Sequence, residues 1–137
     1  MAGVTLDDFL RGQHDAIVYA VQTRMKGDQA MGRVADRQGL SESELSSQVV
    51  GFFLQAIRAD AAIGSTTTLE ENLQWLVVLR SGHDLPFGDE MVMHMFDEVS
   101  EEIEARLPSK VLREEYKAYR EKGEELVRRA FPECNGG

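Results

Sequence analysis

The stretch HDLPFGDEMVMHMFDE, residues 83 to 98, places two histidines, three methionines and several carboxylates around a single turn. Histidine nitrogens are common ligands of haem iron and of transition metals. His83 and His94 are therefore candidate haem ligands. Whether either one reaches a group in the interior depends on the helices that carry it and on the face to which it points.

The length and composition of the chain predict a single globular domain. Its 137 residues suffice for one core, and 42% hydrophobic against 28% charged residues is typical of a folded globular protein. We expect the domain to cover residues 1–131 and residues 132–137 to form a flexible tail. The lone Cys134 in this tail has no second thiol with which to form an intrachain disulfide.

The charge and the hydropathy pattern argue against two classes of partner. The formal net charge of −9, with no run of Lys and Arg, makes nucleic acid a poor direct ligand. No apolar stretch approaches the roughly 18 to 20 residues that a membrane span requires, and the N-terminus lacks a secretory signal. We therefore expect a cytoplasmic protein that binds neither nucleic acid nor membrane.

Capping signals and apolar periodicity predict an all-α fold, a globin-like or related bundle of about five main helices. The expected N-caps are Thr5, Ser41, Thr68 and Ser109, and an acidic residue follows each of the first three by three positions. A connection without sustained periodicity covers residues 26–39. Apolar residues nearly encircle the end of the third helix, which should therefore be the central and most buried one. The predicted helices cover about 5–25, 41–60, 68–82, 89–107 and 109–131.

Helical geometry points His94 away from the core. At about 100° per residue, the apolar side chains of the fourth helix cluster within about 80° of one another. These are Val92, Phe96, Val99, Ile103 and Leu107. His94 lies on the opposite side, one turn from Glu98, which is typical of a solvated face. His83 lies in the predicted turn beside Asp84, where a histidine can cap a helix, face water or bind a cofactor.

The third histidine, His14, flanks the apolar face of the first helix, and we expect it to be half-buried with one hydrogen-bond partner. No two histidines have the close helical spacing of a preformed metal site, and no H-E-x-x-H arrangement appears. The sequence therefore predicts no metal site and no cofactor. The alternative is haem held by His83 or His94.

Several aromatic and methionine side chains could line an apolar ligand pocket between the helices. The alternative is that they fill an ordinary core. The candidates for the pocket wall are Phe52, Phe53, Trp75, Met91, Met95 and Phe96.

Apolar residues on the fifth helix recur at spacings of four and three, the period of a seam between two helices. Such a seam would join two copies of the chain as a homodimer, or it would hold the helix against its own domain. Gly123 on the seam weakens the coiled-coil interpretation. The candidate seam residues are Leu112, Tyr116, Tyr119 and Leu126.

Catalytic motifs are missing from the sequence, which has no G-x-S-x-G, no P-loop and no G-x-G-x-x-G. Neighbouring carboxylates such as Glu101 and Glu102 are adjacent on a helix, so they diverge instead of converging on a substrate. We therefore predict that the protein is not an enzyme.

The stretches GLSESELSSQVVGFFLQAI and LRSGHDLPFGDEMVMHMFDEV follow an opening helix that carries a histidine. This order resembles the N-terminal sensor domains of stressosome proteins of the RsbR type and their relatives fused to signalling kinases. The matching elements, within residues 40 to 110, are the G-L-S-x-x-E-L helix start at 39–45 and the turn at 80–82. The resemblance implies a globin-like fold that generally lacks haem, dimerises through helices and signals to an attached or partner module. It supplies no catalytic residue.

The chain departs from this pattern in its long 26–39 connection and in showing no output domain after Phe131. We expect either a free-standing sensor or a domain cut at its linker. The leading hypothesis is a non-enzymatic cytoplasmic sensor or interaction domain, in which ligand or partner binding moves the last helix. The competing hypothesis is a haem-binding globin that senses a diatomic gas. Expected partners are a second copy of the chain, a signalling protein or fused output domain, and an apolar small ligand.

Overall fold

The computed structural model describes residues 4–25, 32, 35–36, 39, 41–83 and 89–131, with the side chains of 42, 79–83 and 89–91 left aside. Within these residues the protein is all-helical and has five helices, as the periodicity predicted. Most of the predicted connection at 26–39 and the predicted tail at 132–137 lie outside the described residues. The helices are α1 (Leu6–Arg24), α3 (Glu42–Ile63), α4 (Thr67–His83), α5 (Asp89–Arg106) and α6 (Lys110–Ala130).

Three of the four predicted N-caps are confirmed. Thr5 Oγ1 accepts a hydrogen bond from Asp8 N at 3.1 Å, and Ser109 Oγ accepts one from Leu112 N at 3.2 Å. At the start of α3, Ser41 Oγ accepts from Glu44 N while Glu44 Oε1 accepts from Ser41 N, which completes a capping box. Each such cap contributes about 1 kcal/mol by satisfying backbone donors that have no partner within the helix.

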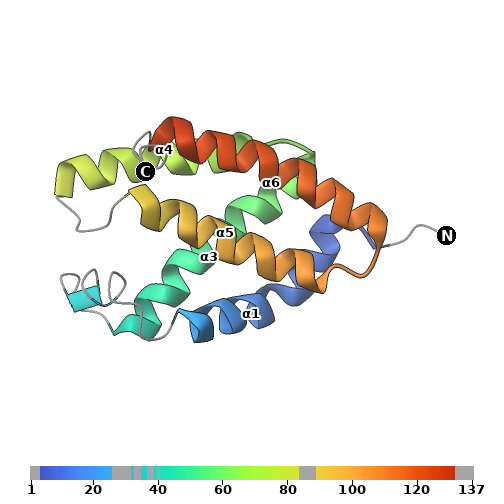
Figure 1. Ribbon diagram of the computed structural model, residues 1–137, viewed down its shortest axis with the longest axis horizontal. Helices are drawn as coiled ribbons and strands as arrows, with labels where there is room; N and C mark the ends of the chain where they lie inside the picture. Colours follow the sequence, from blue (N-terminus) through green and yellow to red (C-terminus); the bar gives the residue numbers. More distant parts are fainter. Residues whose placement is uncertain are drawn as a thin grey trace.

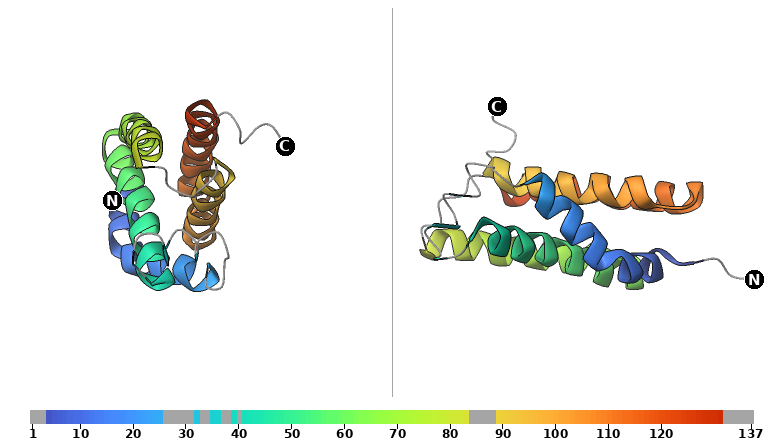
Figure 2. Two further views of the ribbon diagram at one scale, coloured as in Figure 1. Left: turned by 90° about the vertical axis from the view of Figure 1, so that its left-hand side faces the viewer. Right: turned by 90° about the horizontal axis from the view of Figure 1, so that it is seen from below.

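The helices form two antiparallel pairs, α3 with α4 and α5 with α6, that face each other across the core (Figures 1 and 2). Helix α1 crosses one side of the bundle and packs against α3 and α5, while α4 and α6 meet on the other side. Figure 1 shows that α4 and α6 run in the same direction. No helix in the described part of the chain is long and apolar enough to cross a membrane.

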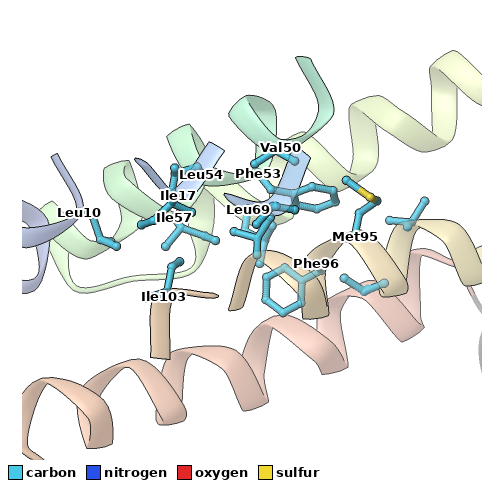
Figure 3. Close-up of a cluster of buried hydrophobic side chains, with 14 of the residues drawn as sticks. Leu10, Ile17, Val50, Phe53, Leu54, Ile57, Leu69, Met95, Phe96 and Ile103 are labelled. Carbon is cyan, nitrogen blue, oxygen red and sulfur yellow. The ribbon is translucent and has the colours of Figure 1, made fainter. Parts of the chain in front are cut away.

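One apolar core lies between the two pairs, and all helices contribute to it (Figure 3). The predicted face of α5 is confirmed, because its five apolar stripe residues are all buried. Phe96 at the centre of this stripe packs beside Gly123 of α6. A Cβ added at Gly123 would collide with Phe96 Cζ and lie 3.1 Å from Leu69 Cδ2, so α4, α5 and α6 approach closely only because this residue has no side chain.

Charged side chains tie the outer edges of α5 to its neighbours. Arg24 of α1 forms ion pairs with Glu98, at 3.0 Å, and with Glu102, which also binds Arg106. Arg120 of α6 approaches Glu104 at 3.1 Å and three further carboxylates at 3.6 to 3.8 Å. These pairs lie at the rim of the bundle and leave the centre apolar.

The prediction that the third helix is the central and most buried one is wrong. In α4, Trp75 is 53% exposed and Val78 is 70% exposed, and of the described apolar side chains only Leu69 and Leu73 are fully buried. The reason is that α4 packs mainly against two of the described helices, α3 and α6, so one side of it has no partner among the described residues. Apolar residues nearly encircle the end of this helix, but its described neighbours cover only part of its circumference.

Candidate functional site

His94 is exposed on α5, on the side away from the core, as the periodicity predicted. The carboxylate one turn later, Glu98, accepts its hydrogen bond from Arg24 of α1. His83 is the last residue of α4, and its side chain lies outside the described part of the structure. The candidate haem ligand that can be placed therefore faces away from the interior.

His14 of α1 lies half-buried where this helix meets α3 and has one hydrogen-bond partner among the described residues, as predicted. Arg58 Nη1 lies 3.2 Å from His14 Nδ1, so the guanidinium donates and the imidazole accepts through this nitrogen. Burial and the charge of Arg58 lower the pKa of His14, and Asp15 opposes this shift. The neutral imidazole is the form that can accept from Arg58, so this contact holds α1 against α3.

The candidate pocket residues occupy three kinds of position. Phe53, Met95 and Phe96 are fully buried and fill the core, which was the alternative interpretation of these residues (Figure 3). Phe52 is half-buried, and its ring lies 5.7 Å from that of the exposed Trp75. The remaining candidate, Met91, belongs to α5, but its side chain lies outside the described residues.

The candidate seam residues of α6 face the protein's own core. Leu112 and Tyr116 are buried, and the Tyr116 hydroxyl lies 2.8 Å from Ser100 Oγ of α5. Burial raises the pKa of Tyr116. Tyr119 and Leu126 are half-buried. This placement agrees with the interpretation in which the helix lies on its own domain.

An open hollow of about 560 Å³ lies where the end of α3, the turn into α4 and the middle of α6 meet. Gly64 ends α3 and begins the turn beside this hollow. Its φ of 67° is a left-handed conformation that favours glycine. The residues around the hollow combine apolar, hydroxyl and charged side chains. They are Leu6, Asp60, Ala61, Gly64, Ser65, Thr66, Glu115, Ala118, Tyr119, Glu121, Lys122 and Glu125.

The polar centre of this hollow's wall is Asp60, which is fully buried. Its Oδ1 accepts from Thr68 N at 2.8 Å, and its Oδ2 accepts from Leu69 N at 3.0 Å and from the Tyr119 hydroxyl at 2.8 Å. One carboxylate therefore joins α3, the first turn of α4 and α6. It receives two of the four backbone N–H groups that the start of a helix leaves without partners.

This arrangement corrects the predicted cap at Thr68. Helix α4 begins one residue earlier, at Thr67, and its first turn is capped by Asp60, which is eight residues upstream of Thr68. Ser65 Oγ supplies a further acceptor, to Thr67 N at 3.2 Å. The sequence does contain a signal for Asp60, since it is a charged residue on the otherwise apolar face that includes Ile57, and buried carboxylates need partners.

The electrostatics of the Asp60 contact keep Tyr119 protonated. Burial and the neighbouring charge of Asp60 raise the pKa of Tyr119, so its hydroxyl remains a hydrogen-bond donor at neutral pH. The bond links two elements that are far apart in the sequence, and it lies beside a space open to solvent. An occupant of the hollow would therefore lie against the half-buried Tyr119, which donates its hydrogen bond to the fully buried Asp60.

A second hollow, of about 480 Å³, runs between α4 and the C-terminal half of α6. Its lining is Glu70, Leu73, Gln74, Val77, Val78, Leu126, Arg129 and Ala130. Among the described residues, no three His, Cys, Asp or Glu side chains are grouped so that they could hold a metal ion. No family model, curated protein or solved structure matches the chain.

Proposed function

We propose that this chain is a non-enzymatic sensor or interaction domain of the cytoplasm, free of haem, that relays ligand or partner binding through α6. The observation that supports the proposal most directly is the hydrogen bond from Tyr119 to the buried Asp60, at the wall of the open hollow. The same carboxylate caps α4, so the position of α6 and the start of α4 depend on one group.

The relay follows from the elements around the hollow. Ala61 belongs to α3, Ser65 to the turn and Ala118 to α6, so an apolar ligand or partner side chain bound there contacts all three. An occupant that separates Tyr119 from Asp60 removes a hydrogen bond worth about 1 kcal/mol, which corresponds to about a fivefold change in the population of docked α6. Binding then shifts an equilibrium between two positions of the helix.

In the proposed relay, the movement of the C-terminal helix α6 carries the signal to the next protein or domain. Its last turn carries the exposed, basic Arg128 and Arg129, which can contact a signalling partner or an attached module. We further propose that the domain acts as a homodimer, so that displacement of α6 in one copy is transmitted to a pair of chains.

A covalent probe that fills the hollow tests the relay and stands in for the ligand. In a Cys134→Ser background, Ser65→Cys is alkylated with N-ethylmaleimide to occupy the hollow, and hydrogen exchange of the α6 amides is followed by mass spectrometry. Alkylation should accelerate exchange in α6. The matched control is Ile63→Cys, an exposed position that does not line the hollow.

The two variants separate the possible outcomes. Faster exchange in α6 after alkylation of Ser65→Cys, but not of Ile63→Cys, supports the relay. Unchanged exchange in α6 with the hollow occupied would refute it, because α6 would then be insensitive to what lies beside Asp60.

A further inference from the structure

One side of α4 is left uncovered by the other described helices. A helix that carries apolar residues on most sides is normally buried, yet Trp75 and Val78 are more than half exposed. Val78 also lines the hollow between α4 and α6, so the exposed apolar surface of α4 extends into this hollow. An apolar groove beside an exposed apolar residue is typical of an interaction site.

Both apolar and charged side chains line this α4–α6 groove. Apolar side chains from both helices form the floor, namely Leu73, Val77, Leu126 and Ala130. Glu70 and Arg129 line the groove as exposed charges of opposite sign. Glu71 lies next to Glu70 and is also exposed. Arg128 lies next to Arg129 and is exposed as well, so each charge has a neighbour of the same sign.

The positions of the two charges follow from the parallel course of α4 and α6 (Figure 1). Gly123 lies beside Leu69, where the helices touch. Glu70 follows Leu69 by one residue, whereas Arg129 follows Gly123 by six. The offset of five residues corresponds to about 8 Å along the groove at 1.5 Å per residue. Glu70 therefore lies near one end of the groove and Arg129 farther along it, with Val77 and Val78 beyond Arg129.

We propose that the occupant of the α4–α6 groove is a second copy of this chain, docked antiparallel about a two-fold axis beside Leu73. A two-fold axis exchanges the ends of the groove, so Glu70 of each copy faces Arg129 of the other. Leu73 and Leu126 lie closest to this axis, and Val77 and Val78 extend the apolar surface of the interface beyond Arg129. The two copies therefore place the guanidinium of Arg129 opposite the carboxylate of Glu70, and these opposite charges attract each other.

The contact that Arg129 makes within its own chain leaves it able to pair with Glu70 of a second copy. Its guanidinium pairs with Glu125 one turn earlier, at 2.5 Å, but 70% of the side chain remains exposed. Exposed pairs within a helix contribute little, so Arg129 can turn to a second carboxylate at low cost. The inference rests on the proposed homodimer, and it assigns the interface to α4 and the end of α6 because Leu112 and Tyr116 of the predicted seam are buried within their own chain.

The first experiment measures the mass of the whole chain in solution by sedimentation equilibrium over a wide concentration range. We expect a dimer in the parent and a rise of at least tenfold in its dissociation constant for Val78→Asp. The matched control is Val111→Asp, an equally exposed valine in the first turn of α6, far from the groove, which should leave the constant unchanged.

The outcomes distinguish the interface from the homodimer itself. A parent that is dimeric but insensitive to Val78→Asp overturns the groove and leaves the homodimer in place through another surface. A monomeric parent overturns both. Neither result affects the relay through Asp60, which is tested by hydrogen exchange.

A charge exchange tests the antiparallel orientation. Glu70→Arg and Arg129→Glu should each raise the dissociation constant several-fold, because each places like charges together across the two-fold axis. The double variant should return the constant close to that of the parent. Loss of helix stability from a cation near the start of α4 cannot explain such a recovery. Single variants without effect, or a double variant as weak as the singles, would overturn the orientation.

Discussion

Helices α4 and α5 have similar lengths, 17 and 18 residues, but the fold uses them differently. Helix α5 presents one narrow apolar stripe, and Phe96, Val99 and Ile103 on it are completely buried among α1, α3 and α6. Helix α4 is apolar on several sides and still leaves Trp75 and Val78 exposed. The number of neighbouring helices therefore determines burial, and the count of apolar residues in an element does not.

The largest expected effect compares one aromatic side chain from each helix. Phe96→Ala should lower the free energy of unfolding by about 3 to 5 kcal/mol, because it leaves a cavity beside Gly123. Trp75→Ala should cost about 1 kcal/mol, since about half of the side chain already contacts water. Urea denaturation of both variants at one protein concentration measures the difference. Equal costs would contradict the contrast between the two helices.

The next effect concerns the buried carboxylate of Asp60, which caps the start of α4. Asp60→Asn keeps the shape of the side chain but turns an NH₂ group towards at least one N–H or O–H donor, and should cost about 1 to 3 kcal/mol. Tyr119→Phe, which removes only the third bond, should cost about 1 kcal/mol. Urea denaturation measures both, and an Asp60→Asn protein as stable as the parent would show that the cap is dispensable.

A smaller and pH-dependent effect distinguishes the charged edge of α5. Burial alone would raise the pKa of Glu102, but hydrogen bonds from Arg24 and Arg106 outweigh it and lower the pKa. Its stabilising contribution is therefore complete above the unfolded-state value of 4.5 and declines as the pH falls below it. Glu102→Gln should cost about 1 kcal/mol or less at pH 7.

The measurement for Glu102 is a comparison of the two proteins across pH. Urea unfolding at pH 7 and at pH 3.5 should show the advantage of the parent over Glu102→Gln shrinking at the lower pH. An advantage that is constant across this range would mean that the carboxylate acts through packing and not through its charge.

The smallest expected effect is on the exposed side of α5. His94→Ala should change the free energy of unfolding by about 0.5 kcal/mol or less, because the side chain has no role in the core. Incubation with haem should give the same visible spectrum for the parent and the variant. A Soret band present in the parent and lost in His94→Ala would make this surface a haem site.

The sequence predicted the positions of the helices better than it predicted which helices pack against one another. The stripe of α5 and the capping box at Ser41 depend on residues within a few positions of one another, so periodicity and local chemistry identify them. The exposure of α4 depends on which helices pack beside it, and several of its faces are equally apolar. The cap from Asp60 depends on a turn that brings the end of α3 back to α4, which no local rule contains.

The candidate sites divide in the same way. The outward direction of His94 and the half-buried position of His14 followed from helical geometry. The hollow beside Asp60 lies between segments separated by more than fifty residues, and most of the side chains around it are small or polar. Two of the four aromatic residues that suggested a pocket, Phe53 and Phe96, fill the core instead, because large apolar side chains are often buried, while Phe52 is half-buried and Trp75 is exposed.

The missing side chain at Gly123 also limits how α6 can move. If α6 slid along its axis, a residue with a Cβ would have to pass the ring of Phe96, and the close contact between α6 and α5 would be lost. Tilting about Gly123 leaves that contact in place while both ends of the helix swing in opposite directions. In the proposed relay, Gly123 would therefore be the pivot of α6, and a small displacement near Tyr119 would move Arg129 in the opposite direction.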